Sequence, residues 1–289
     1  MSAVRWLVRC GVGAAVLLLA CGLATARFGT GLQMPATTTR DGTLIMLNRF
    51  MREPVPETVL VGSSMTFRLK EEYFATPRLR NLALAGGSPV TGLLIVANQP
   101  QLPRVILVEA NVLSRPLDSE LVERYSQRNA EPLFFRPVRV AVAAYENRLH
   151  APLTYAQVAG DLRRLLAQPP SDFDNRVYVA RALGEFTAED PTEAARSNAR
   201  HLESLIPALE RRGTRVLLFE LPYEDEIESA RAAVITREII HGAFPESDRW
   251  LRIDAERSEL RWADGVHLDE RSAVIVAQSI ERALASVRR

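Results

Sequence analysis

Short apolar runs alternate with amphipathic segments along most of the chain. The runs are almost continuously apolar, which is typical of strands that a parallel sheet buries on both faces. They cover residues 58–61, 80–85, 104–109, 214–221 and 250–254. Apolar residues at helical spacing predict helices over residues 68–74, 90–98, 198–212, 226–242 and 272–287. This alternation predicts an α/β domain, a three-layer sandwich around a mainly parallel sheet of about five strands.

Two stretches interrupt the alternation. Residues 114–195 are rich in Arg, Glu, Pro and aromatic residues, and they predict a mainly helical insertion that caps the domain. Residues 31–57 carry frequent Gly, Thr and Pro with weak periodicity, which is typical of a connector. The expected organisation is an N-terminal segment over residues 1–30, the connector, and an α/β domain over residues 58–289 that contains the insertion.

The N-terminal segment carries a long apolar stretch without charges. It follows Arg5 and Arg9 and runs from Cys10 to Ala26. Its length of about 17 residues lies at the short edge of what spans a bilayer. Because the basic residues precede it, the positive-inside rule places the N-terminus in the cytoplasm and the domain on the periplasmic or external side.

Several versions of this export hypothesis fit the segment. A signal anchor would hold the domain at the cytoplasmic membrane through residues 10–26. A signal peptide cleaved after the small-x-small sequence at residues 24–26 would give a secreted domain, and a lipoprotein signal ending at Cys21 would give a lipid-anchored one. A buried core helix is the remaining alternative, and the terminal, arginine-led position and the lack of a polar face disfavour it.

Composition narrows the function classes. The formal net charge of +1 gives no electrostatic attraction to nucleic acid. Both cysteines lie in the N-terminal segment, so the domain has neither a disulfide framework nor a cysteine-based metal site. His150, His201 and His241 lack ligand spacing, and no dinucleotide-binding glycine pattern is present, so we expect neither a metal nor a cofactor.

Polar residues follow the C-terminal ends of the expected strands, where open α/β sheets bind ligands. Ser64 follows the first strand, Gly86 the second and Asn111 the third, whereas Asp264 and His267 precede the last helix. A serine becomes nucleophilic beside a base, and a carboxylate can hold that histidine in the required tautomer. Backbone N–H groups and an Asn amide can stabilise an oxyanion. The pattern predicts an acyl-transfer site with Ser64 Oγ about 3 Å from His267 and with Asp264 at the other ring nitrogen.

Each of these residues also has a structural interpretation. Ser64 could cap a helix, and Asp264 could form an Asx-turn at Gly265. Asn111 could bond the backbone of its loop, and Gly86 could serve a turn.

The four sequence blocks around these residues resemble those of the SGNH, or GDSL-like, hydrolases. They are VLVGSSMT, NLALAGGS, VEAN and DGVHLD, in that family's order, and the resemblance covers residues 58–110 and 196–285. It implies an SGNH hydrolase-like, flavodoxin-like fold in which Ser64 is the nucleophile, His267 the base and Asp264 the residue that orients it. Ser64, Gly86 and Asn111 would form the oxyanion hole.

The blocks depart from the family pattern at three positions. Ser63 stands where the family usually has Asp, Glu109 where it has Gly, and Val112 where it has Asp. The Gly-Ser-Ser form is similar to that of envelope members related to polysaccharide O-acetylation and to D-alanyl transfer onto teichoic acids.

The resemblance implies an exported or membrane-anchored serine esterase or O-acyltransferase. Its substrate would be an acylated envelope glycan, and the envelope polysaccharide machinery is a candidate partner. The altered third block indicates the alternative, a catalytically inactive SGNH-like binding or assembly protein of the cell envelope.

Overall fold

A parallel four-stranded sheet organises the domain. The computed structural model describes residues 3–28, 39–76, 78–126 and 153–287, together with Val142, Tyr145 and Leu149. The strands are β1 (Thr58–Val61), β2 (Leu79–Asn81), β3 (Val105–Glu109) and β4 (Arg215–Phe219), in the order β2-β1-β3-β4. All neighbouring strands pair in parallel, as the continuous apolar runs predict.

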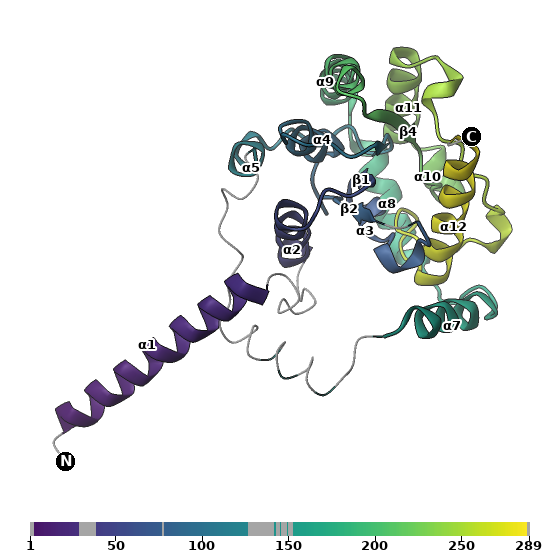
Figure 1. The fold of residues 1–289 in the computed structure, drawn as a ribbon. Coiled ribbons are helices and arrows are strands. Elements are labelled where there is room, and N and C mark those ends of the chain that lie inside the picture. The colour runs from purple at the N-terminus through teal and green to yellow at the C-terminus, as the bar shows by residue number, and fades with distance from the viewer. Residues whose placement is uncertain are drawn as a thin grey trace.

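Helices cover both faces of the sheet, which gives the three expected layers (Figure 1). On one face, α2 (Thr39–Arg52), α4 (Pro89–Ala97) and α9 (Thr192–Arg211) pack against alternate strand residues such as Val61 and Val108. On the other, α12 (Glu270–Val287) packs against residues such as Leu60 and Leu107. The helix α11 (Arg231–Ala243) contributes buried residues to both layers.

The expected fifth strand is reduced to one bridge. Trp250 pairs in parallel with Leu218, and the N–H of Leu251 donates to the carbonyl of Leu218 at 2.7 Å. The Trp250 ring stacks on His241 at 4.0 Å and donates to the carbonyl of Phe244. One backbone hydrogen bond and the side-chain contacts of Trp250 with the end of α11 therefore hold this segment. The prediction of a strand over residues 250–254 was wrong.

Several helix boundaries differ from the expected ones. The helix predicted over residues 68–74 is replaced by α3 (Ser64–Phe67) and the short 3₁₀ turn η2 (Glu71–Tyr73). The helix predicted over residues 226–242 is two helices, α10 (Asp225–Glu228) and α11, because Ala230 between them is extended. Two further 3₁₀ turns in the described part of the chain are η3 (Ser247–Arg249) and η4 (Arg257–Glu259).

The expected connector contains a core helix. Leu47, Phe50 and Met51 of α2 are buried against the first face of the sheet. The spacing of Leu44, Leu47 and Met51 is helical, but the surrounding Thr and Gly obscured it. The part of the connector before residue 39 lies outside the described residues.

The insertion is helical where it is described. It contains α5 (Ser119–Arg124), α7 (Tyr155–Leu166), α8 (Arg176–Ala188) and the beginning of α9. Residues 127–141 and most of residues 143–152 lie outside the described part of the chain. Leu162 of α7 and Leu183 of α8 are half-buried against the second layer.

The N-terminal helix α1 (Ala3–Phe28) projects away from the domain (Figure 1). Its stretch Ala3–Ala24 is long and apolar enough to cross a membrane, with a mean hydropathy of 2.1. None of its apolar window is buried, which excludes the core-helix alternative. Within the described ranges, no other helix meets the same criteria.

Candidate functional site

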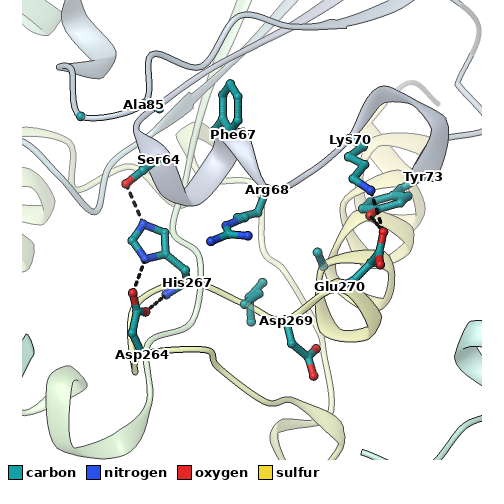
Figure 2. A pocket seen from close by; sticks show the side chains of 13 residues that line it. Ser64, Phe67, Arg68, Lys70, Tyr73, Ala85, Asp264, His267, Asp269 and Glu270 are labelled. Atoms are coloured by element: carbon teal, nitrogen blue, oxygen red, sulfur yellow. Dashed lines mark hydrogen bonds and ion pairs between the residues drawn. The ribbon is translucent and has the colours of Figure 1, made fainter. Parts of the chain in front are cut away.

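The strand order places a crevice at one edge of the sheet. The chain moves from β1 to β2 in one direction and from β3 to β4 in the other, so the loops that follow β1 and β3 diverge. A cavity of about 730 Å³ opens beside the residues that follow β1 and β2. Gly86 lines it, together with Ser64, Asp264 and His267 (Figure 2).

Ser64, His267 and Asp264 form a continuous hydrogen-bonded row in this cavity (Figure 2). Ser64 Oγ lies 2.8 Å from His267 Nε2, and His267 Nδ1 lies 2.7 Å from Asp264 Oδ2. An ionised carboxylate only accepts hydrogen bonds, so Nδ1 carries the proton in the neutral imidazole and Nε2 accepts from the Ser64 hydroxyl. The arrangement satisfies the distance predicted from the sequence and leaves the serine proton facing a base.

The Asp264 carboxylate is held in its ionised form. Burial alone raises its pKa, but hydrogen bonds from the side chain and N–H of His267 outweigh burial and lower the pKa to about 2. Its other oxygen, Oδ1, accepts from the N–H groups of Val266 and His267 at 3.0 and 2.8 Å. The Asx-turn interpretation of Asp264 is therefore correct as well, because one carboxylate both shapes the loop and contacts the imidazole.

Backbone contacts fix the loop that carries Asp264 and His267. Trp262 bridges Leu268 in antiparallel fashion, and the N–H of Ala263 donates to the carbonyl of His267 at 2.8 Å. Gly265 adopts φ +84°, and a Cβ there would lie 3.0 Å from Ile227 Cγ1. Only glycine combines this backbone conformation with such close packing.

The insertion also braces this loop. Asn175, directly before α8, donates from Nδ2 to the carbonyl of Trp262 at 2.8 Å and to Glu224 at 3.2 Å. The Trp262 indole donates to the carbonyl of Pro222 at 2.9 Å. Sequence reasoning missed Asn175, since nothing in the pattern of the insertion connects it with a loop 87 residues away.

A buried carboxylate organises the turn that carries Ser64. Glu109, at the end of β3, is completely inaccessible to solvent. Its carboxylate accepts from the N–H and hydroxyl of Ser63 at 2.8 and 2.7 Å, and from the N–H and hydroxyl of Thr66 at 3.2 and 2.6 Å. Four donors thus solvate the charge that burial removes from water. Ser63 and Glu109, two departures from the family pattern, are direct partners.

Gly62 permits this contact. A Cβ at this position would lie 2.3 Å from Thr66 Oγ1 and 2.6 Å from Glu109 Oε2. The carboxylate therefore approaches the backbone in space that any side chain would occupy.

Two backbone donors in the site are unengaged. Ser63, Met65 and Thr66 direct their N–H groups to Glu109 or to Ser63 Oγ. Among the described residues, neither the N–H of Ser64 nor that of Gly86 donates a hydrogen bond. Gly86 adopts φ +79°, which favours glycine, and its missing side chain leaves the approach to its N–H open.

Asn111 does not join these donors. Its Nδ2 donates to the carbonyl of Leu221 at 2.8 Å, its Oδ1 accepts from the N–H of Leu221 at 2.7 Å, and it does not line the cavity. The expected oxyanion role is replaced by the structural alternative, in which the amide ties the loop after β3 to the loop after β4. Val112 packs half-buried against the second layer.

A charged cluster forms the far wall of the cavity (Figure 2). Glu270 Oε1 accepts from Lys70 Nζ at 2.6 Å and from the Tyr73 hydroxyl at 2.9 Å. Burial and the hydrogen bond to Glu270 raise the pKa of Tyr73 to about 12, so its hydroxyl stays protonated. The sequence pattern did not predict this cluster, because Glu270 lies about 200 residues after Lys70 and Tyr73.

No protein-family model and no curated protein matches this chain, so the geometry of the site carries the functional argument. In the described part of the chain, no group of three or more His, Cys, Asp or Glu residues is placed to hold a metal ion.

Proposed function

We propose that this protein is a serine esterase or O-acyltransferase that works through an acyl-enzyme on Ser64. One observation carries the proposal: the hydrogen-bonded row from Ser64 through His267 to Asp264 opens on a cavity with two unengaged N–H groups. A nucleophile, a base, an orienting carboxylate and oxyanion donors are the parts that acyl transfer requires.

The reaction follows from these positions. Ser64 Oγ attacks the carbonyl carbon of an ester while its proton passes to His267 Nε2. The N–H groups of Ser64 and Gly86 stabilise the negative oxygen of the tetrahedral intermediate. The bond to the ester alcohol then breaks, and His267 returns the proton to the departing oxygen. Asp264 remains ionised throughout and stabilises the charged imidazolium.

The second half-reaction decides between hydrolysis and transfer. A water molecule or a sugar hydroxyl attacks the acyl-Ser64 carbonyl and gives its proton to His267. The bond between the acyl carbon and Ser64 Oγ then breaks, and His267 returns the proton to Oγ. Water yields the free acid, a sugar yields a new ester, and both regenerate Ser64. The same site geometry serves both outcomes.

Two further features support an envelope substrate. The sequence blocks resemble those of SGNH proteins that act on envelope polysaccharides. The helix α1 is suited to anchor the chain in the cytoplasmic membrane, and the arginines before it orient the domain outward in this proposal. An acylated glycan at the outer face of that membrane is the proposed substrate.

The position of Asn111 favours a second candidate, a binding or assembly protein without turnover. The Asn111 amide is engaged by Leu221, which leaves two oxyanion donors where the resemblance implies three. In this case the cavity would bind an acylated glycan and leave its ester intact.

Covalent labelling distinguishes the two candidates. We expect a fluorophosphonate to label the full-length protein in detergent micelles, and Ser64→Ala to abolish the labelling, because the probe reacts only with an activated serine. Ser204→Ala on the surface of α9 serves as the matched control and should label like the parent. Labelling that persists in Ser64→Ala, or its absence in the folded parent, would contradict the esterase proposal.

A further inference from the structure

Among the described residues, one cation that lines the cavity has no acidic partner. The acidic and basic residues of the cavity are Arg68, Lys70, Asp264, His267, Asp269 and Glu270. Lys70 and Glu270 pair with each other, and Asp264 pairs with His267. Asp269 accepts the N–H of Ser272 in the first turn of α12, where the helix dipole favours a negative charge.

Arg68 has no such partner. Among the residues that the structure describes, no hydrogen bond or ion pair reaches its guanidinium. In Figure 2 the guanidinium extends into the cavity beside His267, whereas the carboxylate of Asp269 points away from it. The Arg68 side chain is exposed to solvent where it lines the cavity, and a cation there without a counter-ion attracts a negative group from outside.

The backbone places Arg68 on the same side as the nucleophile. Arg68 is the C-cap of α3 with helical φ and ψ, four residues after Ser64. Residues four apart on a helix are neighbours on one face. A group bound by Arg68 would therefore lie beside an ester carbonyl that Ser64 attacks.

We propose that Arg68 is a specificity residue that binds an anionic group, a carboxylate or a phosphate, on the sugar of the acylated substrate. The inference rests on the proposed function and adds the charge of its substrate. The planar guanidinium suits both groups, because its paired N–H donors match two oxygens at once. The site therefore selects acidic glycans over neutral ones.

Arg68 could instead stabilise the oxyanion, and that alternative makes a different prediction. An oxyanion forms with every ester, so its loss would lower turnover of neutral and anionic esters alike. A specificity residue changes the ratio between the two. The ratio is thus the quantity to measure.

The experiment uses the full-length protein in detergent micelles with three matched substrates. These are a monoacetylated methyl glucoside, the corresponding glucuronoside with a carboxylate, and the corresponding glucoside phosphate. Acetate release gives kcat/KM for each. We expect the parent to prefer at least one anionic substrate by about tenfold or more. The carboxylate and phosphate arms show which of the two groups the site accepts.

Variants of Arg68 test the assignment. In Arg68→Ala the ratio of anionic to neutral kcat/KM should fall about tenfold or more, and in Arg68→Glu it should fall below one. Arg68→Lys should give an intermediate ratio, because it keeps the charge and loses the paired donors. The control Arg200→Ala, an exposed arginine on α9, should keep the parent ratio.

A second measurement does not depend on turnover. The unacetylated glucuronoside or glucoside phosphate should slow fluorophosphonate labelling of Ser64 at lower concentration than the glucoside does. The difference should disappear in Arg68→Ala.

Two results would overturn the inference and leave the proposed function intact. They are Ser64-dependent labelling without any preference for anionic sugars, and a preference that Arg68→Ala leaves unchanged. A parent that is not labelled at all would reject the proposed function itself.

Discussion

Glu109 and Asp264 each accept hydrogen bonds from the backbone of a loop in the site, but their other hydrogen-bond partners differ. Glu109 lies beneath the serine turn, fully buried, and accepts from the N–H groups of Ser63 and Thr66. Asp264 lies on the other side, with its side chain 34% exposed, and accepts from the N–H groups of Val266 and His267. Each carboxylate thus fixes the backbone of one of the two loops that meet in the site.

The remaining partners distinguish the two. Among the described residues, the other hydrogen-bond partners of Glu109 are the hydroxyls of Ser63 and Thr66, which do not titrate in the physiological range. The Asp264 carboxylate contacts the imidazole of His267, a ring that can both accept and donate a proton. The same carboxylate-to-backbone contact is therefore structural where its neighbours are hydroxyls and suited to chemistry where its neighbour is a base.

Removal of the base should produce the largest effect. In His267→Ala we expect ester turnover to fall by about 10⁶-fold, because the serine keeps its proton. His201→Ala on α9 is the matched control and should keep the parent rate. Turnover is measured as acetate release by the full-length protein. A loss below about tenfold would place the base elsewhere.

Neutralising the half-buried carboxylate of Asp264 should lower activity more than stability. Asp264→Asn keeps the shape of the loop but no longer holds the tautomer of His267, so kcat should fall by about 10⁴-fold. The melting temperature in detergent should change by only a few degrees, corresponding to about 1 kcal/mol. A large loss of stability with normal kcat would reverse the roles that we assign to the two carboxylates.

Removal of the buried Glu109 carboxylate should, in contrast, lower the stability of the protein strongly. Glu109→Ala leaves four buried donors without an acceptor, and we expect the free energy of unfolding to fall by about 3–5 kcal/mol. Denaturant titration followed by circular dichroism measures this. Glu228→Ala, which removes a more exposed carboxylate, is the control. An unchanged unfolding midpoint in Glu109→Ala would show that the network contributes nothing.

The smallest expected effect is the pH dependence of stability from Asp264. Its pKa is lowered from 3.8 to about 2, so its stabilising contribution is complete above about pH 3.8 and disappears as the pH falls through 2. Solvent screening limits the contribution to about 1 kcal/mol. The stability difference between the parent and Asp264→Asn should therefore shrink between pH 4 and 2. A constant difference over that range would contradict the lowered pKa.

The continuous apolar runs along the chain predicted both the sheet and the position of the candidate site. Continuous apolar runs identified the strands, and the residues that follow parallel strands meet at one edge. Ser64 and Gly86 could therefore be placed together from their positions along the chain. Asp264 and His267 could be added because their short spacing lets one turn present both side chains.

The missed features depend on contacts that a linear pattern does not contain. In the sequence, nothing distinguishes Glu109 from other residues at the end of a strand. The pairing of β1 with β3 brings its carboxylate within hydrogen-bond distance of Ser63. The hydrogen bond from the Asn111 amide to Leu221 also depends on the fold, because the loop after β4 lies beside Asn111. Asn175 contacts the loop at Trp262 from the insertion, and the apolar periodicity of the insertion does not predict how it packs.

The hydrogen bond between Ser64 and His267 joins residues 203 positions apart in the chain. The ribosome makes Ser64 well before His267, so a growing chain holds the serine before its hydrogen-bond partner exists. Closing so long a loop is entropically costly and slow compared with local folding. In the proposed function, the serine is therefore activated only after α12 can dock on the sheet and hold its preceding loop in place. A growing chain thus carries the proposed nucleophile before its proposed base, so the order of these two residues along the chain itself delays the proposed chemistry.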